Sequence, residues 1–201
     1  PISSHKKASI FSLSTLLKQD LYEDALRYLN GALGIRRDAS DTYYNLALAY
    51  QGLDEPKKAY EVVSIALDFD PNYAEARFLA GEVLLALGDE SGAAVEFRNA
   101  LDLVPEARSV QQALNALGTA GDRTRAAEDA LAAGESSAAL KEAVIAYSID
   151  PDFAPGVKMY AISLDRSGDA TSAVGVYEEA LELLPEDDEI KEALVRLAPA
   201  K

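Results

Sequence analysis

The sequence predicts an all-α protein made of repeated helix pairs. Four predicted helices end in the same way, with an alanine that lies five residues before a proline and a second alanine seven residues before the first. The prolines also recur at a fixed interval, since Pro71 and Pro105 are 34 residues apart, as are Pro151 and Pro185. A fixed period of this size is the signature of an array of helical repeats.

The amino-acid composition agrees with such an array, and the net charge indicates which kinds of partner the protein can bind. The chain is 49% hydrophobic and 26% charged, which is typical of a globular or repeat protein. Its net charge of −15 would repel phosphate backbones and attract a basic peptide or protein, so we expect no nucleic-acid partner. No apolar run approaches the length of a membrane span, so we also expect no direct membrane insertion.

The best-formed repeat covers residues 40–73. Aromatic, leucine and small residues alternate in it before the closing proline: Tyr43, Leu46, Ala47, Tyr50, Ala59, Ala66 and Pro71. This order within 34 residues resembles the tetratricopeptide repeat (TPR), a two-helix unit. The resemblance implies a right-handed α-solenoid of about five TPR-like helix pairs, with one extra helix and a C-terminal capping helix.

The repeats can be placed in order along the chain. The first is degenerate, because Arg37 stands where the proline is expected, and the third has Arg77 in place of the first aromatic residue. The predicted order is a tag or flexible tail (1–5), three repeats within 6–105 (6–39, 40–73 and 74–107), an extra helix and hinge (106–121), two repeats within 120–187 (120–153 and 154–187) and a capping helix (188–201).

The segment between Pro105 and Pro151 breaks the period. It contains twelve residues more than one repeat, and four apolar positions in the surplus follow a helical spacing: Val110, Ala113, Leu114 and Leu117. We favour an unpaired extra helix here, because 120–153 then keeps its alanine and proline positions. The alternative pairs this helix with 122–133 and leaves 136–149 unpaired.

Local chemistry explains why the repeat positions hold the residues they do. A small residue in the first helix of each pair (Ala47, Gly81, Ala127 or Ala161) lets the two helices approach closely. Between the helices, one position holds a residue that tolerates the left-handed conformation: Asp20, Asp54, Gly88, Gly134 or Gly168. Asn72 and Glu75 resemble an N-cap pair that opens the next helix.

The resemblance also implies where a partner would bind. In TPR proteins the first helix of each pair lines a concave surface through repeat positions 2, 5, 9 and 12. We expect the peptide-binding residues to be Asp41, Tyr44, Asn45, Leu48, Gln51, Glu75, Phe78, Glu82, Leu85 and Glu128. The same positions in the first and last units hold Lys7, Ile10, Ser14, Leu17, Pro155, Lys158, Ile162 and Asp165. The alternative is that some of these side chains only pack against neighbouring units.

Two kinds of site are disfavoured. The basic clamp with which co-chaperones of this family hold a C-terminal carboxylate is missing, so an acidic C-terminal peptide is a poor candidate ligand. The only histidine is His5, and there is no cysteine, so hydrolase chemistry of the usual kind has no general base. We expect no cofactor, and we interpret Glu186–Glu189 as a solvated helix start rather than a metal site.

The sequence therefore predicts a non-catalytic scaffold for protein–protein interaction. It would bind a peptide or protein segment with apolar anchors and basic flanks on its concave face. The alternatives are self-assembly into a homo-oligomer, or service as the scaffold domain of a larger protein. The compartment is not identified; we favour the cytoplasm, with the periplasm open if a signal was removed.

Overall fold

The computed structural model describes residues 16–17, 21–33 and 40–198, and among these residues it contains helices and no strand. The predictions made for residues 1–5, Lys7, Ile10, Ser14, Asp20 and Arg37 lie outside the described residues. The chain divides into two compact units, residues 1–106 and 107–201. The all-helical repeat fold predicted from the sequence is confirmed.

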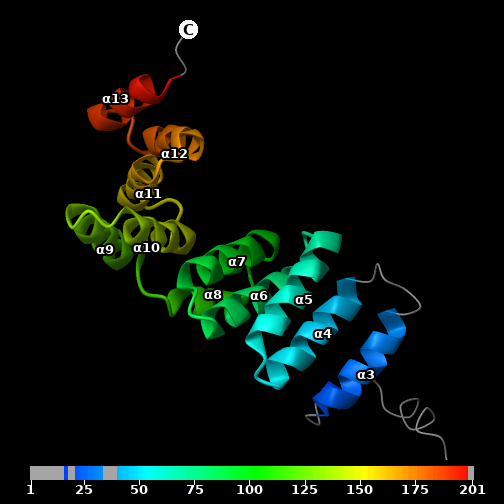
Figure 1. Cartoon of the computed structure of the whole chain (residues 1–201). Helices are drawn as coiled ribbons and strands as arrows, with labels where there is room; N and C mark the ends of the chain where they lie inside the picture. The colour runs from blue at the N-terminus through cyan, green and yellow to red at the C-terminus, as the bar shows by residue number, and fades with distance from the viewer. Residues whose placement is uncertain (1–15, 18–20, 34–39, 199–201) are drawn as a thin grey trace, which may run out of the picture. The chain divides into compact units, whose positions relative to one another are not determined.

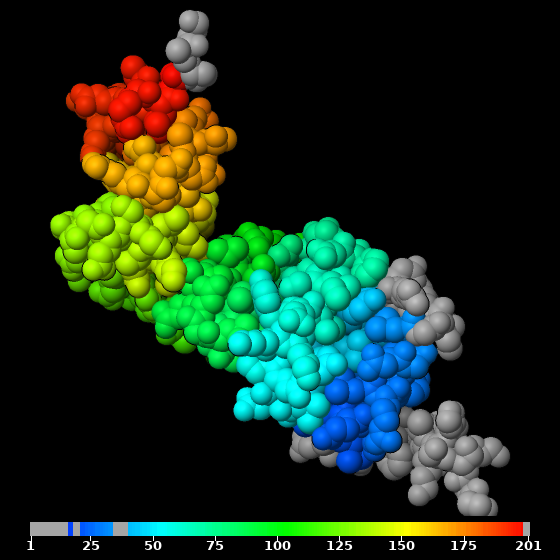
Figure 2. All heavy atoms as spheres, viewed as in Figure 1, coloured from blue at the N-terminus to red at the C-terminus, as the bar shows by residue number. Residues whose placement is uncertain are grey.

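The first unit contains five described helices, in which each helix packs against the next (Figure 1). They are α3 (Tyr22–Leu33), α4 (Ser40–Gly52), α5 (Pro56–Phe69), α6 (Ala74–Ala86) and α7 (Glu90–Leu103). The space-filling view shows the side chains of α4 and α5 closing the space between their ribbons (Figure 2). Alanines and branched residues, among them Ala47, Ala59 and Val63, form the buried seam between these helices.

The second unit begins with the short helix α8 (Arg108–Asn115) and continues through helix pairs. These helices are α9 (Ala120–Ala132), α10 (Ser136–Ile149), α11 (Ala154–Ser167), α12 (Ala170–Leu183) and α13 (Asp188–Leu197). Helix α9 packs against α10, and α11 packs against both of them and against α12. The surplus residues between the repeats therefore contain α8, whose Val110 and Leu114 are buried.

The turn inside each helix pair uses the left-handed conformation at the predicted position. The φ angles are 56° at Asp54, 82° at Gly88, 80° at Gly134 and 92° at Gly168. Glycine adopts this conformation without the steric cost that a β-carbon adds, and aspartate tolerates it better than most residues. The turn chemistry predicted from the sequence is confirmed at all four of these positions.

The small positions are confirmed in the same way. Ala47, Ala127 and Ala161 have no exposed surface, and Gly81 is buried. At Gly81 the constraint is strict, because a β-carbon added there would lie 2.4 Å from the ring of Phe97 on α7. Helices α6 and α7 therefore approach each other at a point that only glycine allows.

Each second helix also ends in one repeated way. In α5, α7, α10 and α12 the residue after the helix leaves the helical conformation, and its backbone N–H donates to the carbonyl of the terminal alanine of the repeat. In α5, the N–H of Asp70 donates to the carbonyl of Ala66 at 2.9 Å, and Pro71 follows. Proline cannot continue a helix, so the chain turns there into the next repeat.

The predicted N-cap at Asn72 is wrong. Helix α6 begins at Ala74, and the preceding Tyr73 makes no capping hydrogen bond through its side chain. The backbone N–H of Asn72 instead donates to Oδ1 of Asp70 at 3.1 Å. The aspartate two residues earlier thus holds the turn, a local competition that the N-cap pattern alone does not reveal.

Arginines replace apolar residues at one position of two repeats. Nη1 of Arg77 lies 2.8 Å from Oε2 of Glu96, and Nη1 of Arg123 lies 2.9 Å from Oε2 of Glu142. Both pairs span 19 residues and join the two helices of one pair. Each arginine also donates through Nε to a backbone carbonyl before its helix. The missing aromatic residue at position 77 is therefore replaced by an ion pair.

Candidate functional site

The first helices of two neighbouring pairs, α4 and α6, meet on one surface of the first unit. Nε2 of Gln51 on α4 donates to Oε2 of Glu82 on α6 at 3.5 Å. This hydrogen bond, a contact between two tyrosine rings and the electrostatic effect of nearby carboxylates on those tyrosines bring six residues together. We define them as the acidic-aromatic face: Asp41, Tyr44, Gln51, Tyr73, Glu75 and Glu82. Asp41, Gln51, Glu75 and Glu82 are exposed there.

Two tyrosines form the apolar part of this face. The rings of Tyr44 and Tyr73 lie 5.0 Å apart between centroids, at an interplanar angle of 43°. Tyr73 was missed by the sequence analysis, because it closes the repeat instead of lying on a first helix. The sequence did contain a signal for it, because Tyr73 is an aromatic residue that immediately precedes a helix predicted to line the groove.

Burial and the neighbouring carboxylates raise the pKa of both tyrosine hydroxyl groups. Burial raises the pKa of Tyr44, and the carboxylates of Glu75 and Glu82 raise it further. Burial likewise raises the pKa of Tyr73, with additional contributions from Asp41, which also accepts a hydrogen bond from it. Both tyrosines therefore remain neutral hydrogen-bond donors at neutral pH, inside a field of negative charge.

Other predicted residues of the first unit are engaged within it. The ring of Phe78 lies 5.7 Å from that of Phe97, and Leu48 packs against the core formed by α4, α5 and α6. Nδ2 of Asn45 donates to the carbonyl of Asp41 at 2.6 Å. Phe78, Leu48 and Asn45 are each partly exposed, whereas Leu85 is exposed. These side chains therefore combine internal packing with an accessible edge.

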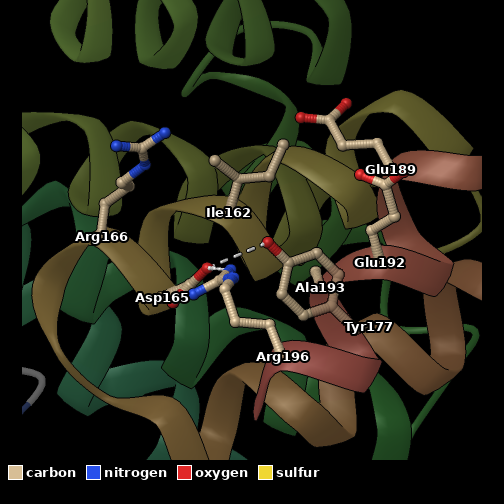
Figure 3. A pocket seen from close by; sticks show the side chains of 8 residues that line it. All are labelled: Ile162, Asp165, Arg166, Tyr177, Glu189, Glu192, Ala193 and Arg196. Carbon is tan, nitrogen blue, oxygen red and sulfur yellow. Dashed lines mark hydrogen bonds and ion pairs between the residues drawn. The ribbon is translucent and has the colours of Figure 1, made fainter.

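The second unit carries a hollow of about 710 Å³ between α11, α12 and α13. Figure 3 shows the side chains that line it: Ile162, Asp165, Arg166, Tyr177, Glu189, Glu192, Ala193 and Arg196. Its floor is apolar, because Ala193 and the ring of Tyr177 are buried and Ile162 is half-buried. Charged groups of both signs surround that floor.

An ion pair holds one wall of the hollow. Both terminal guanidinium nitrogens of Arg196 contact the carboxylate of Asp165, with Nη1 at 3.3 Å from Oδ1. The hydroxyl of Tyr177 donates to Oδ2 of Asp165 at 3.5 Å (Figure 3). Burial and the Asp165 carboxylate raise the pKa of Tyr177 to about 12, so its hydroxyl keeps its proton.

A lysine holds the start of α13 against α11. Nζ of Lys158 lies 2.7 Å from Oδ2 of Asp187 and 2.7 Å from Oε2 of Glu189. The hydrogen bond from Lys158 keeps the pKa of Asp187 below its usual value. Asp187 also caps α13, since it accepts the N–H of Ile190 at 3.1 Å. One carboxylate thus both caps and anchors the helix.

The model of the tetratricopeptide repeat family matches residues 40–73. These residues comprise α4, α5 and the turn that ends at Tyr73. Residues 40–73 are therefore a tetratricopeptide repeat. TPR units stack so that their first helices form an extended binding surface, and such proteins act as scaffolds for protein–protein interaction.

Solved structures with similar helical arrangements include three TPR proteins. MamA is 18% identical over 89% of this chain and 98% of its own, with a TM-score of 0.47. YrrB, described as a TPR protein with an unusual peptide-binding site, is 18% identical over 90% and 87%, with a TM-score of 0.46. The TPR2AB domain of yeast Sti1, solved with pHSP90, is 14% identical over 92% and 80%, with a TM-score of 0.45.

The TPR numbering shows where the predicted residues lie and which were missed. Asp41, Tyr44, Gln51, Glu75 and Glu82 come together on the acidic-aromatic face, whereas Glu128 is exposed on α9 in the other unit. Residues of α13 were not among those predicted, because the sequence analysis interpreted this helix only as a cap. If the numbering is continued from Asp188, the groove positions 2, 5 and 9 are Glu189, Glu192 and Arg196.

Two classes of site can be checked against the described part of the chain. No group of three potential metal ligands lies together among those residues. None of the described helices has the length and apolar character needed to cross a membrane.

Proposed function

We propose that this TPR protein is a non-catalytic scaffold that binds a peptide or protein segment on the acidic-aromatic face of its first unit. The observation that carries the proposal is the meeting of α4 and α6 at Gln51 and Glu82, which joins two groove helices into one surface. Exposed carboxylates surround a half-buried tyrosine pair there.

The chemistry of this face defines the ligand. Three carboxylates (Asp41, Glu75 and Glu82) favour lysine or arginine in the bound segment. Tyr44 and the accessible edge of Phe78 offer apolar contacts, and aromatic residues of this kind are enriched at binding hot spots. The ligand is therefore a segment with apolar anchors and basic flanks, in either a helical or an extended conformation.

A random-peptide display library, selected on the full chain, tests the proposal. We expect enriched sequences to combine one or two large apolar residues with lysine or arginine. The double variant Glu75→Lys with Glu82→Lys should weaken binding of the selected peptides by tenfold or more, because attraction becomes repulsion. Selection of acidic sequences, or binding that survives the charge reversal, would refute the proposal.

The matched control reverses two charges elsewhere in the same unit. Glu61→Lys with Asp68→Lys alters exposed carboxylates on α5, outside the acidic-aromatic face. It changes the net charge by the same amount and should leave the affinity within about twofold at physiological salt. Equal losses in both variants would show that net charge, and not this face, attracts the peptide.

A further inference from the structure

Two neighbouring residues of α3 carry a chemical reactivity that the proposed function does not use. Asn30 is followed by Gly31, and none of the other four asparagines of the chain precedes a glycine. In an Asn-Gly pair the backbone nitrogen of the glycine can attack the side-chain amide of the asparagine, because the glycine has no side chain to obstruct the approach. Among the asparagines of this chain, Asn30 therefore has the sequence context that most favours deamidation.

The helix holds the two reacting groups apart. Nδ2 of Asn30 donates to the backbone carbonyl of Leu26 at 2.9 Å, which directs the side chain toward the preceding turn. Gly31 lies inside α3, where each backbone N–H donates to a carbonyl four residues earlier. Both hydrogen bonds have to break before the glycine nitrogen can reach the amide carbon. Deamidation of the folded protein thus requires the last turn of α3 (residues 30–33) to open.

Few contacts oppose the opening of this last turn. Asn30 and Gly31 are exposed, and Leu33 is only partly buried. The buried residues of the helix, Ala25 and Leu29, lie closer to its start. Glycine is less favourable in a helix than alanine by about 1 kcal/mol, and a β-carbon at Gly31 would meet no other side chain within 4 Å among the described residues. The last turn can therefore open while the rest of α3 stays packed.

We propose that Asn30 is a deamidation site whose reaction is controlled by opening of the last turn of α3. The backbone nitrogen of Gly31 forms a bond to Cγ of Asn30, the bond from Cγ to Nδ2 breaks, and ammonia leaves with the proton of the backbone nitrogen. Water then opens the resulting five-membered succinimide at one of its two carbonyl groups. The product at position 30 is aspartate or isoaspartate, and no oxidant or reductant is needed.

The product fits the end of α3 less well than asparagine does. A carboxylate has no N–H with which to replace the hydrogen bond to Leu26. Its negative charge lies in the last turn, where the helix dipole disfavours an anion. Isoaspartate also lengthens the main chain by one methylene group, which a regular helix does not accommodate. The reaction therefore makes a transient opening of α3 permanent.

Peptide mapping of the full chain by mass spectrometry tests the proposal. Deamidation replaces the amide NH₂ by OH, and the accompanying mass increase is followed at each asparagine during incubation at mildly alkaline pH. In the folded protein we expect Asn30 to react faster than each of the other four asparagines. We also expect Asn30 to react about tenfold or more slowly in the folded protein than in the chain unfolded by guanidinium chloride, because only the open turn reacts.

Two further measurements distinguish opening of the last turn from unfolding of the whole protein. The rate at Asn30 should not change with guanidinium chloride added below the unfolding transition, because opening one turn exposes little surface. Gly31→Ala should slow the reaction several-fold in the folded and in the unfolded chain, because the new β-carbon obstructs the attack. Far-UV circular dichroism verifies that this variant folds.

A third measurement examines the product itself. Asn30→Asp reproduces one product of the reaction and should lower the amide protection factors of the last turn of α3 several-fold, while those of α5 stay unchanged. The proposal would be overturned by equal rates at Asn30 in the folded and unfolded chain, or by a folded rate no higher than at the other asparagines. A rate that rises with denaturant in step with global unfolding would also overturn it. None of these outcomes depends on the acidic-aromatic face.

Discussion

At the scale of single residues, the contact between Gly81 and Phe97 decides how closely α6 and α7 pack. Glycine is a poor residue in the middle of a helix, where alanine is usually favoured by about 1 kcal/mol. At position 81 glycine is instead the more stabilising residue, because the β-carbon of an alanine would lie 2.4 Å from the fully buried ring of Phe97. Overpacking of this kind costs roughly 1–3 kcal/mol, more than the gain in helix propensity.

The first prediction compares two glycines. Gly81→Ala should lower the melting temperature, whereas Gly175→Ala should raise it slightly, because the β-carbon added at Gly175 meets no side chain of a neighbouring helix within 4 Å. Thermal unfolding followed by circular dichroism measures both. A stabilised Gly81→Ala variant would contradict the close approach of α6 and α7.

The ion pair of Arg77 and Glu96 is the second feature at this scale. Their side chains are 21% and 20% exposed, so water screens the pair less than it screens a surface pair. The corresponding residues of the matched unit, Tyr43 and Val62, belong to an apolar cluster. An ion pair or an apolar pair can therefore occupy these two positions. A charged residue at one of them needs the opposite charge at the other, and an apolar residue needs an apolar one.

The second prediction follows from this pairing. Arg77→Tyr or Glu96→Val alone should destabilise the protein by more than 1 kcal/mol, since each leaves a partly buried charge without its partner. The double variant should recover most of the loss, with a coupling free energy of about 1 kcal/mol in chemical denaturation. Additive losses would mean that the two side chains do not interact.

At the scale of elements, α13 depends on electrostatic anchoring as much as on packing. Ile190 and Ala193 are buried against α11 and α12, while Lys158 holds the helix start through Asp187 and Glu189. Partial burial lowers the pKa of Lys158, but the hydrogen bonds to Asp187 and Glu189 outweigh it and raise that pKa overall. The hydrogen bond to Lys158 lowers the pKa of Asp187.

The third prediction is the pH range of this anchor. A depressed carboxyl pKa contributes stability above the unfolded value of about 3.9, and that contribution is lost as pH falls through the lower folded value. The raised lysine pKa contributes below about 10.4 and is lost as pH rises through the higher folded value. The amide protection factors of residues 190–196, in which the intrinsic pH dependence of exchange is removed, should therefore be constant between these limits and smaller outside them.

The control for this range is Lys158→Met. It removes the cation but keeps most of the methylene stem, so the packing of α11 is retained. Exchange in α13 should be faster in this variant at neutral pH, and its response below pH 4 should be smaller. Identical exchange in the variant and the unaltered protein would contradict the anchoring role.

The sequence predicted the elements well, because each repeat is specified by residues close to one another. The turn at Gly88, the small residue at Ala47 and the closing Pro71 each act within a single repeat. Their role can therefore be recognised from nearby residues, without knowledge of the fold. The N-cap at Asn72 was wrong because the competing acceptor, Asp70, lies only two residues away and the outcome depends on turn geometry.

The candidate sites were less predictable for a related reason. Tyr73 joins Tyr44 only because α4 and α6 meet across an intervening helix. The hollow of the second unit depends on Arg196 reaching Asp165, which is 31 residues earlier. Contacts between repeats require the packing of helices and not only their pattern. The binding role of the ten residues predicted from the sequence remains a prediction.

At the scale of the whole molecule, the charge of −15 acts on every encounter with a partner. Such a field raises the association rate of cationic ligands and is screened by salt over about 10 Å at 0.1 M ionic strength. Affinity at short range depends on the contacts described above, whereas the rate of encounter depends on the charge of the entire chain.

The fourth prediction separates these two effects. For a basic peptide selected on the full chain, the association rate constant should fall about tenfold or more between low and physiological salt. The dissociation rate constant should change much less, since it reflects short-range contacts. Stopped-flow fluorescence with a labelled peptide measures both constants. A salt-independent association rate would contradict long-range attraction.

The presence of both ion-paired and apolar helix pairs has a consequence for exchanging parts between repeats. A first helix that carries Arg77 or Arg123 requires a second helix with glutamate 19 residues later, whereas Val157 requires its apolar counterpart Val176. Chimaeras that recombine helices between these two kinds of pair would bury a lone charge, but chimaeras that move whole pairs would not. The smallest interchangeable part of this protein is therefore the intact helix pair, and the single helix is not a module.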